Sequence, residues 1–337
     1  MNASLKEILR TAVAGAGCVD STFDSYWFWI KMMHGAVGGR ASQWTGAEWE
    51  RFEWWLLEQR PPYSLAARRQ ARSAVNFLFV HVLKLEVGKL RLPMLPKPER
   101  ALVVVPTREE MEWIFAKLHG QVLLAARLMH GSGVRVQEAC RIRVQDLDLS
   151  SRQPRLRVWD GKGEKNRWTV LPVSLLSDLH RQMKWREALH ARDLADGNGF
   201  VEMPGRLGRK WKSASRELGW QWLLPSSDVQ EDGKRWHLAP GVVQREVRKA
   251  RLASGIVRRI VPHCFRKAFA SELDRGRAPL AQISALIGHS DINTTAKYYL
   301  ETDIASAFSP ADVPSSALEW RPEVLPLPAQ TERMSLS

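Results

Sequence analysis

The stretch Val261–Leu300, VPHCFRKAFASELDRGRAPLAQISALIGHSDINTTAKYYL, decides how this chain folds and what it does. His263 and Arg266 are three positions apart, so on a helix they share one face. Apolar residues repeat at helical spacing on another face, and Gly276 and Gly288 interrupt the pattern. The stretch therefore predicts a series of short helices with polar side chains near their ends.

Two more polar residues follow in the same stretch. His289 comes directly after Gly288 at a predicted turn. Tyr298 lies nine positions further, on a helix that Thr294 or Thr295 can cap. A lone histidine or tyrosine is more often a core residue, and a lone arginine is more often a surface ion pair. The joint pattern is far less expected by chance, and it favours a functional site.

This stretch resembles the C-terminal motif of the tyrosine recombinases, the integrase family that cuts and rejoins DNA through a phosphotyrosine. The family pattern is H-x-L-R-H, then L-G-H, then a tyrosine nine residues later, and it maps to His263, Arg266, His289 and Tyr298. Phe265 replaces the usual leucine, Lys267 replaces the second histidine, and Tyr299-Leu300 stands in place of Thr-His. Tyr299 is a rival nucleophile, but helical neighbours point about 100° apart.

Two motifs further upstream match the same family. The segment GVRVQEA matches its G-x-R-x-x-E box, which implies that Arg135 is the first catalytic arginine and that Glu138 is structural. Residues 155–171 alternate like a β-hairpin around an Asp-Gly-Lys-Gly turn. The family's G-K-G-x-K-x-R hairpin delivers a catalytic lysine to the minor groove, which implies Lys162, with Lys165 as the alternative. No G-x-x-x-x-G-K-[ST] motif occurs, so ATP use is unsupported.

Composition points to a polyanionic partner. The 337 residues carry a formal net charge of +14, which favours nucleic acid first and an acidic membrane surface second. Three scattered cysteines argue against a disulfide framework and a zinc site, so a reducing cytoplasm is expected. We find neither a signal peptide nor an apolar run of the roughly 20 residues that a membrane span needs.

The chain length suits two domains. Thr45 with Glu48 and Thr107 with Glu110 match the T-x-x-E capping box, which predicts that a helix begins at each place. We expect a mainly α fold with a small β-sheet (α+β). The resemblance implies a two-domain DNA clamp, in which a helical, SAM-like core-binding domain faces the catalytic domain. The predicted segments are an N-terminal lead at 1–20, the core-binding domain at 21–88, a basic Pro-rich linker at 89–106, the catalytic domain at 107–312 with an insertion at 202–240, and a disordered tail at 313–337.

Candidate DNA contacts are spread over both domains. Arg68, Arg69 and Arg72 gather on one predicted helix and form either a solvated face or a phosphate-binding face, and the net charge favours the second. The basic helix at 241–260 places Arg245 and Arg248 near DNA.

The insertion interleaves basic residues with tryptophans, as suits stacking on unpaired bases, although core packing of the tryptophans is equally expected. It resembles the extra segment of the integron integrases, which grips extrahelical bases of a folded single-stranded site. The candidate DNA-binding residues here are Arg209, Lys210, Trp220, Trp222, Pro225 and His237. Trp236 departs from the subgroup's His-His-Leu pattern.

The combined motifs predict an integron-type recombinase that acts on duplex DNA and folded single-stranded cassette sites. Arg135 and Arg266 would stabilise charge on the phosphate, His263 and His289 would manage the tyrosine proton, and Lys162 would protonate the leaving oxygen. No metal or cofactor is required, and the family implies a homo-tetramer on paired sites. The alternatives are a phage-like or chromosome-dimer-resolving recombinase, a type IB topoisomerase, and a non-catalytic DNA-binding relic.

Overall fold

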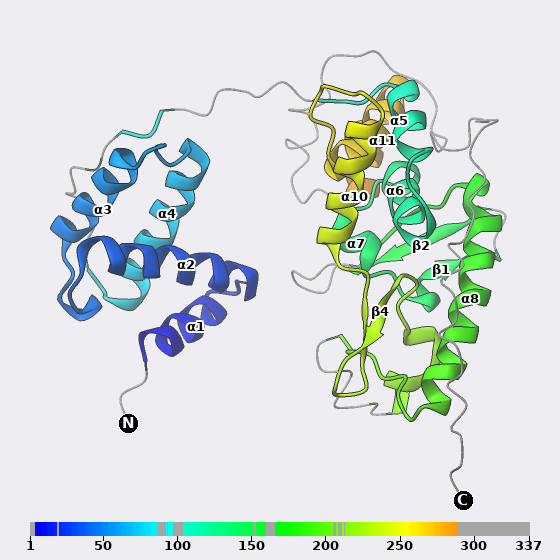
Figure 1. The fold of residues 1–337 in the computed structure, drawn as a ribbon, viewed down its shortest axis with the longest axis horizontal. Helices are drawn as coiled ribbons and strands as arrows, with labels where there is room; N and C mark the ends of the chain where they lie inside the picture. Colours follow the sequence, from blue (N-terminus) through cyan, green and yellow to red (C-terminus); the bar gives the residue numbers. More distant parts are fainter. Residues whose placement is uncertain are drawn as a thin grey trace, which may run out of the picture. The chain divides into compact units, whose positions relative to one another are not determined.

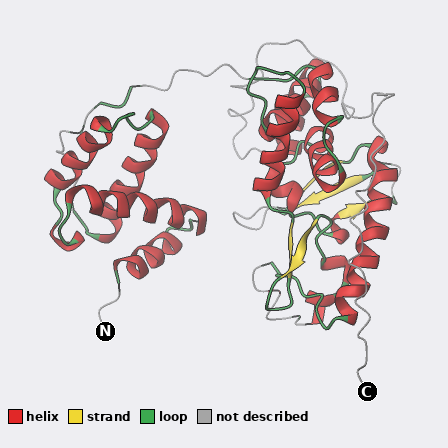
Figure 2. Cartoon of the chain, viewed as in Figure 1, coloured by secondary structure: helices red, strands yellow, loops and turns green. Residues whose placement is uncertain are grey.

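The computed structural model describes residues 4–18, 20–85, 92, 94–96, 104–150, 153–159, 166–204, 207, 211 and 213–288 (Figure 1). The chain divides into two compact units, Met1–Leu102 and Val103–Ser337. Helices dominate both units and the strands are few and short (Figure 2), so the expected mainly α fold with small sheets is confirmed. None of the described helices is long and apolar enough to cross a membrane. The predicted linker lies largely outside the described residues.

The N-terminal unit is a small helical domain with an aromatic core. Its elements are α1 (Leu5–Gly15), α2 (Asp20–Val37), the 3₁₀ turn η1 (Ala41–Gln43), α3 (Gly46–Glu58), α4 (Leu65–Phe77) and the π-helical turn η2 (Leu78–Val82). The predicted capping box at Thr45 is confirmed, because the Thr45 amide donates to Glu48 Oε2 at 2.8 Å. Trp29, Trp44 and Trp49 are buried, so these tryptophans serve as core residues.

The C-terminal unit packs helices from both ends of its sequence around one core. The helices are α5 (Arg108–Phe115), α6 (Gly120–Ser132), α7 (Val136–Cys140), α8 (Leu176–Ala195), α10 (Pro240–Ala253), α11 (Pro262–Arg275) and α12 (Leu280–Ile287). The central helix α6 is buried along most of its length, and it packs against α11. The predicted capping box at Thr107 is confirmed, since its hydroxyl accepts from the Glu110 amide at 3.2 Å.

A three-stranded antiparallel sheet lies beside these helices, in the order β1 (Leu147–Asp148), β2 (Arg155–Val158), β3 (Arg167–Val170). The 3₁₀ turns η3 (Val144–Asp146) and η4 (Val173–Leu175) flank it. The predicted hairpin is confirmed, because β2 pairs with β3 and Val158 lies opposite Arg167. The residues of its turn, 160–165, lie outside the described residues.

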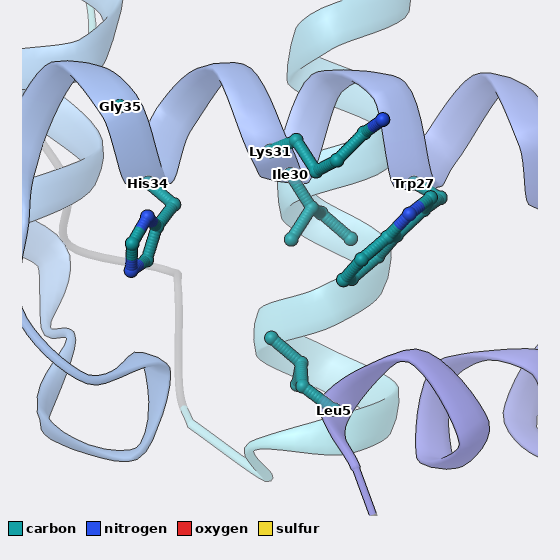
Figure 3. A pocket seen from close by; sticks show the side chains of 6 residues that line it. All are labelled: Leu5, Trp27, Ile30, Lys31, His34 and Gly35. Atoms are coloured by element: carbon teal, nitrogen blue, oxygen red, sulfur yellow. The ribbon is translucent and has the colours of Figure 1, made fainter.

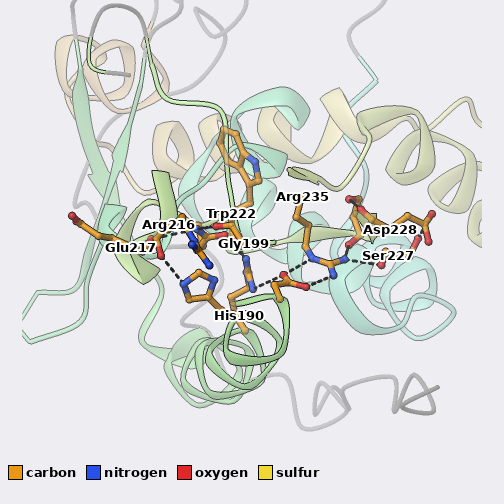
Figure 4. Close-up of polar contacts among 12 residues, drawn as sticks. His190, Gly199, Arg216, Glu217, Trp222, Ser227, Asp228 and Arg235 are labelled. Carbon is orange, nitrogen blue, oxygen red and sulfur yellow. Dashed lines mark hydrogen bonds and ion pairs between the residues drawn. The ribbon is translucent and has the colours of Figure 1, made fainter. Parts of the chain in front are cut away.

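The insertion forms a compact lobe against α8. It contains the 3₁₀ turns η5 (Ser213–Arg216) and η6 (Leu218–Trp220) and a two-stranded antiparallel sheet, β4 (Pro225–Val229) with β5 (Arg235–His237). Buried polar groups tie the lobe to the helix (Figure 4). Arg235 makes a forked ion pair with Asp193 of α8, at 2.6 and 2.8 Å, and Arg186 donates to Gln221 Oε1 at 2.6 Å.

Candidate active site and DNA-binding surface

The turn that ends α6 at Gly133 helps to position Arg266. Gly133 ends α6 with φ +66°, and a Cβ at this position would lie 2.4 Å from the Phe269 ring of α11. Glycine therefore allows the two helices to approach closely. Arg266 of α11 uses this approach, because its Nη1 donates to the Gly133 carbonyl at 2.6 Å and its side chain is only 3% exposed.

Arg135 lies at the start of α7, beside the same cluster. Its backbone amide donates to Glu138 Oε2 and its Nη1 donates to Glu138 Oε1, both at 2.7 Å. Its Nη2 donates to the carbonyl of Gly288 at 3.1 Å. The side chain remains 44% exposed, so part of Arg135 faces solvent while Glu138 and the Gly288 carbonyl fix its orientation.

Glu138 is the carboxylate at the centre of the cluster. Burial alone would raise its pKa, but the hydrogen bonds and charges of Arg167 and Arg135 outweigh burial and lower the pKa to about 2. The group is therefore ionised at neutral pH. It compensates part of the positive charge that the arginines bring together.

His263 lies at the first turn of α11 and shares this positive environment. The residue is exposed, but desolvation by its neighbours and the charges of Lys267, Arg266 and Arg135 lower its pKa below the usual histidine value. The neutral imidazole, which can accept a proton, is therefore favoured near pH 7. The structure thus brings together Arg135, His263 and Arg266, which come from two motifs more than 100 residues apart.

Six candidate residues lie outside the described residues, and their expected roles stay predictions: Lys162, Lys165, Arg209, Lys210, His289 and Tyr298.

Arg167 is a participant that sequence reasoning did not single out. It is the final arginine of the G-K-G-x-K-x-R match, which was the available signal. Its Nη1 and Nη2 donate to the two oxygens of Glu138 at 3.1 and 2.7 Å. Its Nε donates to the Leu286 carbonyl at 3.1 Å. The first residue of β3 therefore joins the arginine cluster.

The N-terminal arginines correct the expectation of a phosphate-binding face. Arg68 is buried at 8% exposure, and Arg72 makes a forked ion pair of 2.7 and 2.9 Å with the buried Glu53 of α3. Arg69 is half-buried and donates to the carbonyl of Pro96. These side chains hold the domain together, because a buried carboxylate such as Glu53 needs a partner.

The insertion corrects a second expectation. Trp220 and Trp222 are 9% and 6% exposed, so they are core residues and not open stacking platforms. Arg143 lies over the Trp222 ring at 3.8 Å, and the His237 ring meets Trp222 edge-on at 5.3 Å. Pro225 is also buried.

His237 is partly buried and accepts a hydrogen bond from Arg141 at 3.3 Å. Burial lowers the pKa of this histidine, which keeps it a neutral structural partner.

Two of the predicted residues are exposed, and so are two tryptophans of the insertion that were not predicted to contact DNA. Arg245 and Arg248 lie on the exposed side of α10, as expected, although Arg245 also pairs with Glu246 at 3.2 Å. Within the insertion, the exposed indoles are those of Trp211 and Trp236, at 49% and 39%. The positions that could stack on a base are therefore shifted from those inferred by resemblance.

A separate concavity lies in the N-terminal unit, between α1 and α2 (Figure 3). Its volume is about 460 Å³ and its lining residues are Leu5, Trp27, Ile30, Lys31, His34 and Gly35. Arg135, His263 and Arg266, the described residues that are expected to perform catalysis, do not line it. Its walls are mostly apolar, as expected where the facing sides of two amphipathic helices are not fully packed against each other.

Comparison with known proteins gives a consistent result. The sequence profile of the phage integrase family matches residues 107–304. An integrase/recombinase of Escherichia coli is 32% identical over 299 residues, covering 86% of this chain and 88% of that protein. The tyrosine recombinase XerA of Thermococcus kodakarensis is 26% identical over 206 residues, covering 60% of each. A solved lambda integrase tetramer bound to a Holliday junction superposes with a TM-score of 0.58 at 16% identity, covering 87% of this chain and 75% of that one.

Proposed function

The chain belongs to the phage integrase family and is a tyrosine-type site-specific recombinase, and from this premise we propose that it cuts and rejoins DNA through a 3′-phosphotyrosine on Tyr298. One observation carries the proposal most strongly. Arg135 and Arg266 come from distant segments, yet both donate to the end of α12 and both lie beside Glu138. Two guanidinium groups held in one place form a site for a phosphate.

The proposed reaction needs no oxidant or nucleotide. The Tyr298 oxygen attacks the scissile phosphorus, and the bond to the 5′ oxygen breaks. Negative charge grows on the non-bridging oxygens, where Arg135 and Arg266 stabilise it. His263 and His289 accept the tyrosine proton or hold the phosphate, and Lys162 protonates the departing 5′ oxygen. A 5′ hydroxyl of another strand then reverses these steps and restores the DNA backbone.

A covalent-adduct assay tests this proposal. Purified protein is mixed with labelled DNA without Mg²⁺ or ATP, and denaturing gels report protein-linked DNA for the wild type and for Tyr298→Phe. An adduct that is lost in Tyr298→Phe supports the nucleophile. An adduct that persists moves the nucleophile to Tyr299 or elsewhere. Removal of one arginine should slow the reaction by roughly 10²–10³-fold, as for other preorganised donors.

We further propose that the substrates include folded single-stranded cassette sites as well as duplex DNA. The support is the Gly-Trp-Gln-Trp pattern of the insertion and the lobe that it builds on α8. Because Trp220 and Trp222 are buried, we assign base stacking to the exposed Trp236 and Trp211. Stacking of one base on an indole is worth about 1–3 kcal/mol, or roughly 5–150-fold in affinity.

The matching experiment compares hairpin DNA with and without extrahelical bases. We expect Trp236→Ala to weaken binding of the bulged hairpin by about tenfold or more and to leave the plain hairpin unaffected. Trp113→Ala is a matched control, because Trp113 is also exposed, at 55%, but lies on α5, outside the insertion. Equal affinity of the two hairpins for the wild-type protein would instead support the phage-like or chromosome-dimer-resolving alternative, which shares the chemistry but does not need the insertion.

Assembly and location follow from the same premise. We propose a homo-tetramer on two paired sites, supported by the tetrameric state of the similar lambda integrase on its Holliday junction. Crosslinking on DNA that carries two sites would reveal four subunits, whereas two subunits would contradict the proposal. We also propose action in the cytoplasm, where thiols stay reduced; the three cysteines of the chain are all unpaired.

A further inference from the structure

Three arginines from three different elements converge on the last carbonyls of α12. The Leu286 carbonyl accepts from Arg167 of β3 at 3.1 Å, and the Gly288 carbonyl accepts from Arg135 of α7 at 3.1 Å. The carbonyl between them, that of Ile287, accepts from Arg266 of α11. The carbonyls at a helix C-terminus lack intrahelical partners and carry partial negative charge, so they attract cations.

The same three arginines surround one carboxylate. Glu138 Oε1 accepts from Arg135 Nη1 at 2.7 Å and from Arg167 Nη1 at 3.1 Å. Glu138 Oε2 accepts from the Arg135 amide and from Arg167 Nη2, both at 2.7 Å. Arg266 Nη1 stays 3.8 Å from Oε2, beyond hydrogen-bond distance. Both oxygens of Glu138 thus accept hydrogen bonds from Arg135 and Arg167, and neither accepts one from Arg266 Nη1.

Arg167 differs from Arg266 in the acceptor that it holds. Its guanidinium donates to both oxygens of Glu138, whereas Arg266 Nη1 stays 3.8 Å from Oε2. All three nitrogens of its guanidinium have acceptors in the protein. The group also packs against the backbone of Gly288, where a Cβ would lie 2.7 Å from Arg167 Nη1.

We propose that Arg167 is a positioning residue for the two phosphate-binding arginines, an inference that rests on the proposed recombinase chemistry. It occupies both oxygens of Glu138 and the Leu286 carbonyl. Without it, Glu138 would make a forked pair with Arg135 or Arg266 and draw that guanidinium away from the phosphate. With it, three guanidinium groups and one carboxylate leave a surplus of positive charge where the phosphate gathers negative charge.

The geometry requires arginine at this position. A guanidinium presents parallel donors that match the two carboxylate oxygens while its Nε reaches a third acceptor. A lysine ammonium would keep the charge, but it is a point donor and cannot hold Glu138 and Leu286 in the same way. The Arg167→Lys variant therefore keeps the positive charge but loses the paired hydrogen bonds to Glu138, so it distinguishes the two contributions.

The experiment measures single-turnover adduct formation at saturating DNA for wild type, Arg167→Gln, Arg167→Lys and Arg155→Gln. Arg155 is the matched control, because it is an ion-paired arginine on the adjacent strand β2 that contacts Asp148. We expect Arg167→Gln to react about 10²-fold more slowly with unchanged DNA affinity, since small misplacements of catalytic groups cost this much. Arg167→Lys should react at least about tenfold more slowly than wild type, and Arg155→Gln should react at the wild-type rate.

A second substrate distinguishes positioning of the arginines from positioning of the lysine on the same hairpin. With sulfur in place of the bridging 5′ oxygen, the leaving group needs no proton, so any defect in acid catalysis disappears. We expect the Arg167→Gln defect to persist on this substrate. Recovery of the wild-type rate would overturn the proposal and assign Arg167 to the hairpin lysine.

Full activity of Arg167→Lys or of Arg167→Gln would also overturn the proposal. This holds for Arg167→Lys even where Arg167→Gln loses activity, since that loss would then only follow unfolding. A wild-type protein that forms no adduct on any recombination-site DNA would contradict the proposed function instead.

Discussion

Substitution of Gly133 by alanine should damage both the stability and the chemistry of the C-terminal unit. The new Cβ would lie 2.4 and 2.6 Å from two atoms of the Phe269 ring and 3.1 Å from Ile287 Cγ2. Phe269 is fully buried, so the ring has no empty space to enter. Overpacking of this kind costs about 1–3 kcal/mol, and left-handed backbone in an L-residue costs about 1–2 kcal/mol more.

The matched control is Gly197→Ala. Gly197 also has a left-handed φ, +79°, but a Cβ there would meet nothing within 4 Å. It carries the backbone strain without the clash, so the two variants should differ by the overpacking term of about 1–3 kcal/mol. Urea denaturation of the full chain measures this difference through the unfolding transition of the C-terminal unit.

The rate of adduct formation should also depend on the contact between Gly133 and Phe269. Arg266 lies one helical turn before Phe269 and donates to the Gly133 carbonyl, so displacement of α11 moves that guanidinium. Adduct formation by Gly133→Ala should fall by about 10–100-fold at a temperature where the protein is folded, while Gly197→Ala should keep the wild-type rate. Equal loss of stability in the two variants would refute the steric reasoning, and full activity of Gly133→Ala would refute its link to Arg266.

Three further predictions follow from other contacts. Because the pKa of His263 is lowered, the acidic limb of the pH–rate profile for adduct formation should have its midpoint below the usual histidine pKa, and His263→Gln should lose that limb. Asp193→Asn leaves buried arginines without their counter-charge and should cost about 3–5 kcal/mol of unfolding free energy by urea denaturation; the control Asp232→Asn breaks an exposed pair worth at most about 1 kcal/mol, and equal effects would contradict the burial argument. Burial raises the pKa of Cys140 to about 12, so iodoacetamide should label the exposed Cys18 in the native protein and reach Cys140 only after unfolding, as mass spectrometry of peptides would report; labelling of Cys140 in the native state would refute this.

Features that depend on a few neighbouring residues were predicted well from the sequence. The capping boxes at Thr45 and Thr107 require only a partner three positions away, so their local pattern is sufficient. The β2–β3 hairpin has its strands separated by a short glycine-containing turn, and its alternation appears within the same segment. The grouping of His263 and Arg266 follows from helical periodicity alone.

Features that depend on distant partners were not predicted. Arg72 reads as an exposed helical arginine until the neighbouring helix presents the buried Glu53. Trp222 has the same local pattern whether its ring points toward DNA or into the lobe, and Arg143 lies under it only after the chain has folded. Arg167 looked like the end of a lysine motif, because its partner Glu138 is 29 positions away.

The sequence by itself determined the family, the mainly helical class and the chemical types at the site, because motif spacing and periodicity are carried by neighbouring residues. The tertiary structure alone decided which arginine side chains are exposed to a ligand and which are buried in the protein. A charged or aromatic side chain acquires its role from whatever packs against it, and burial selects that partner from anywhere in the chain. Hence Arg135 keeps an open face, while Arg68 and Trp220 are enclosed by their own domains.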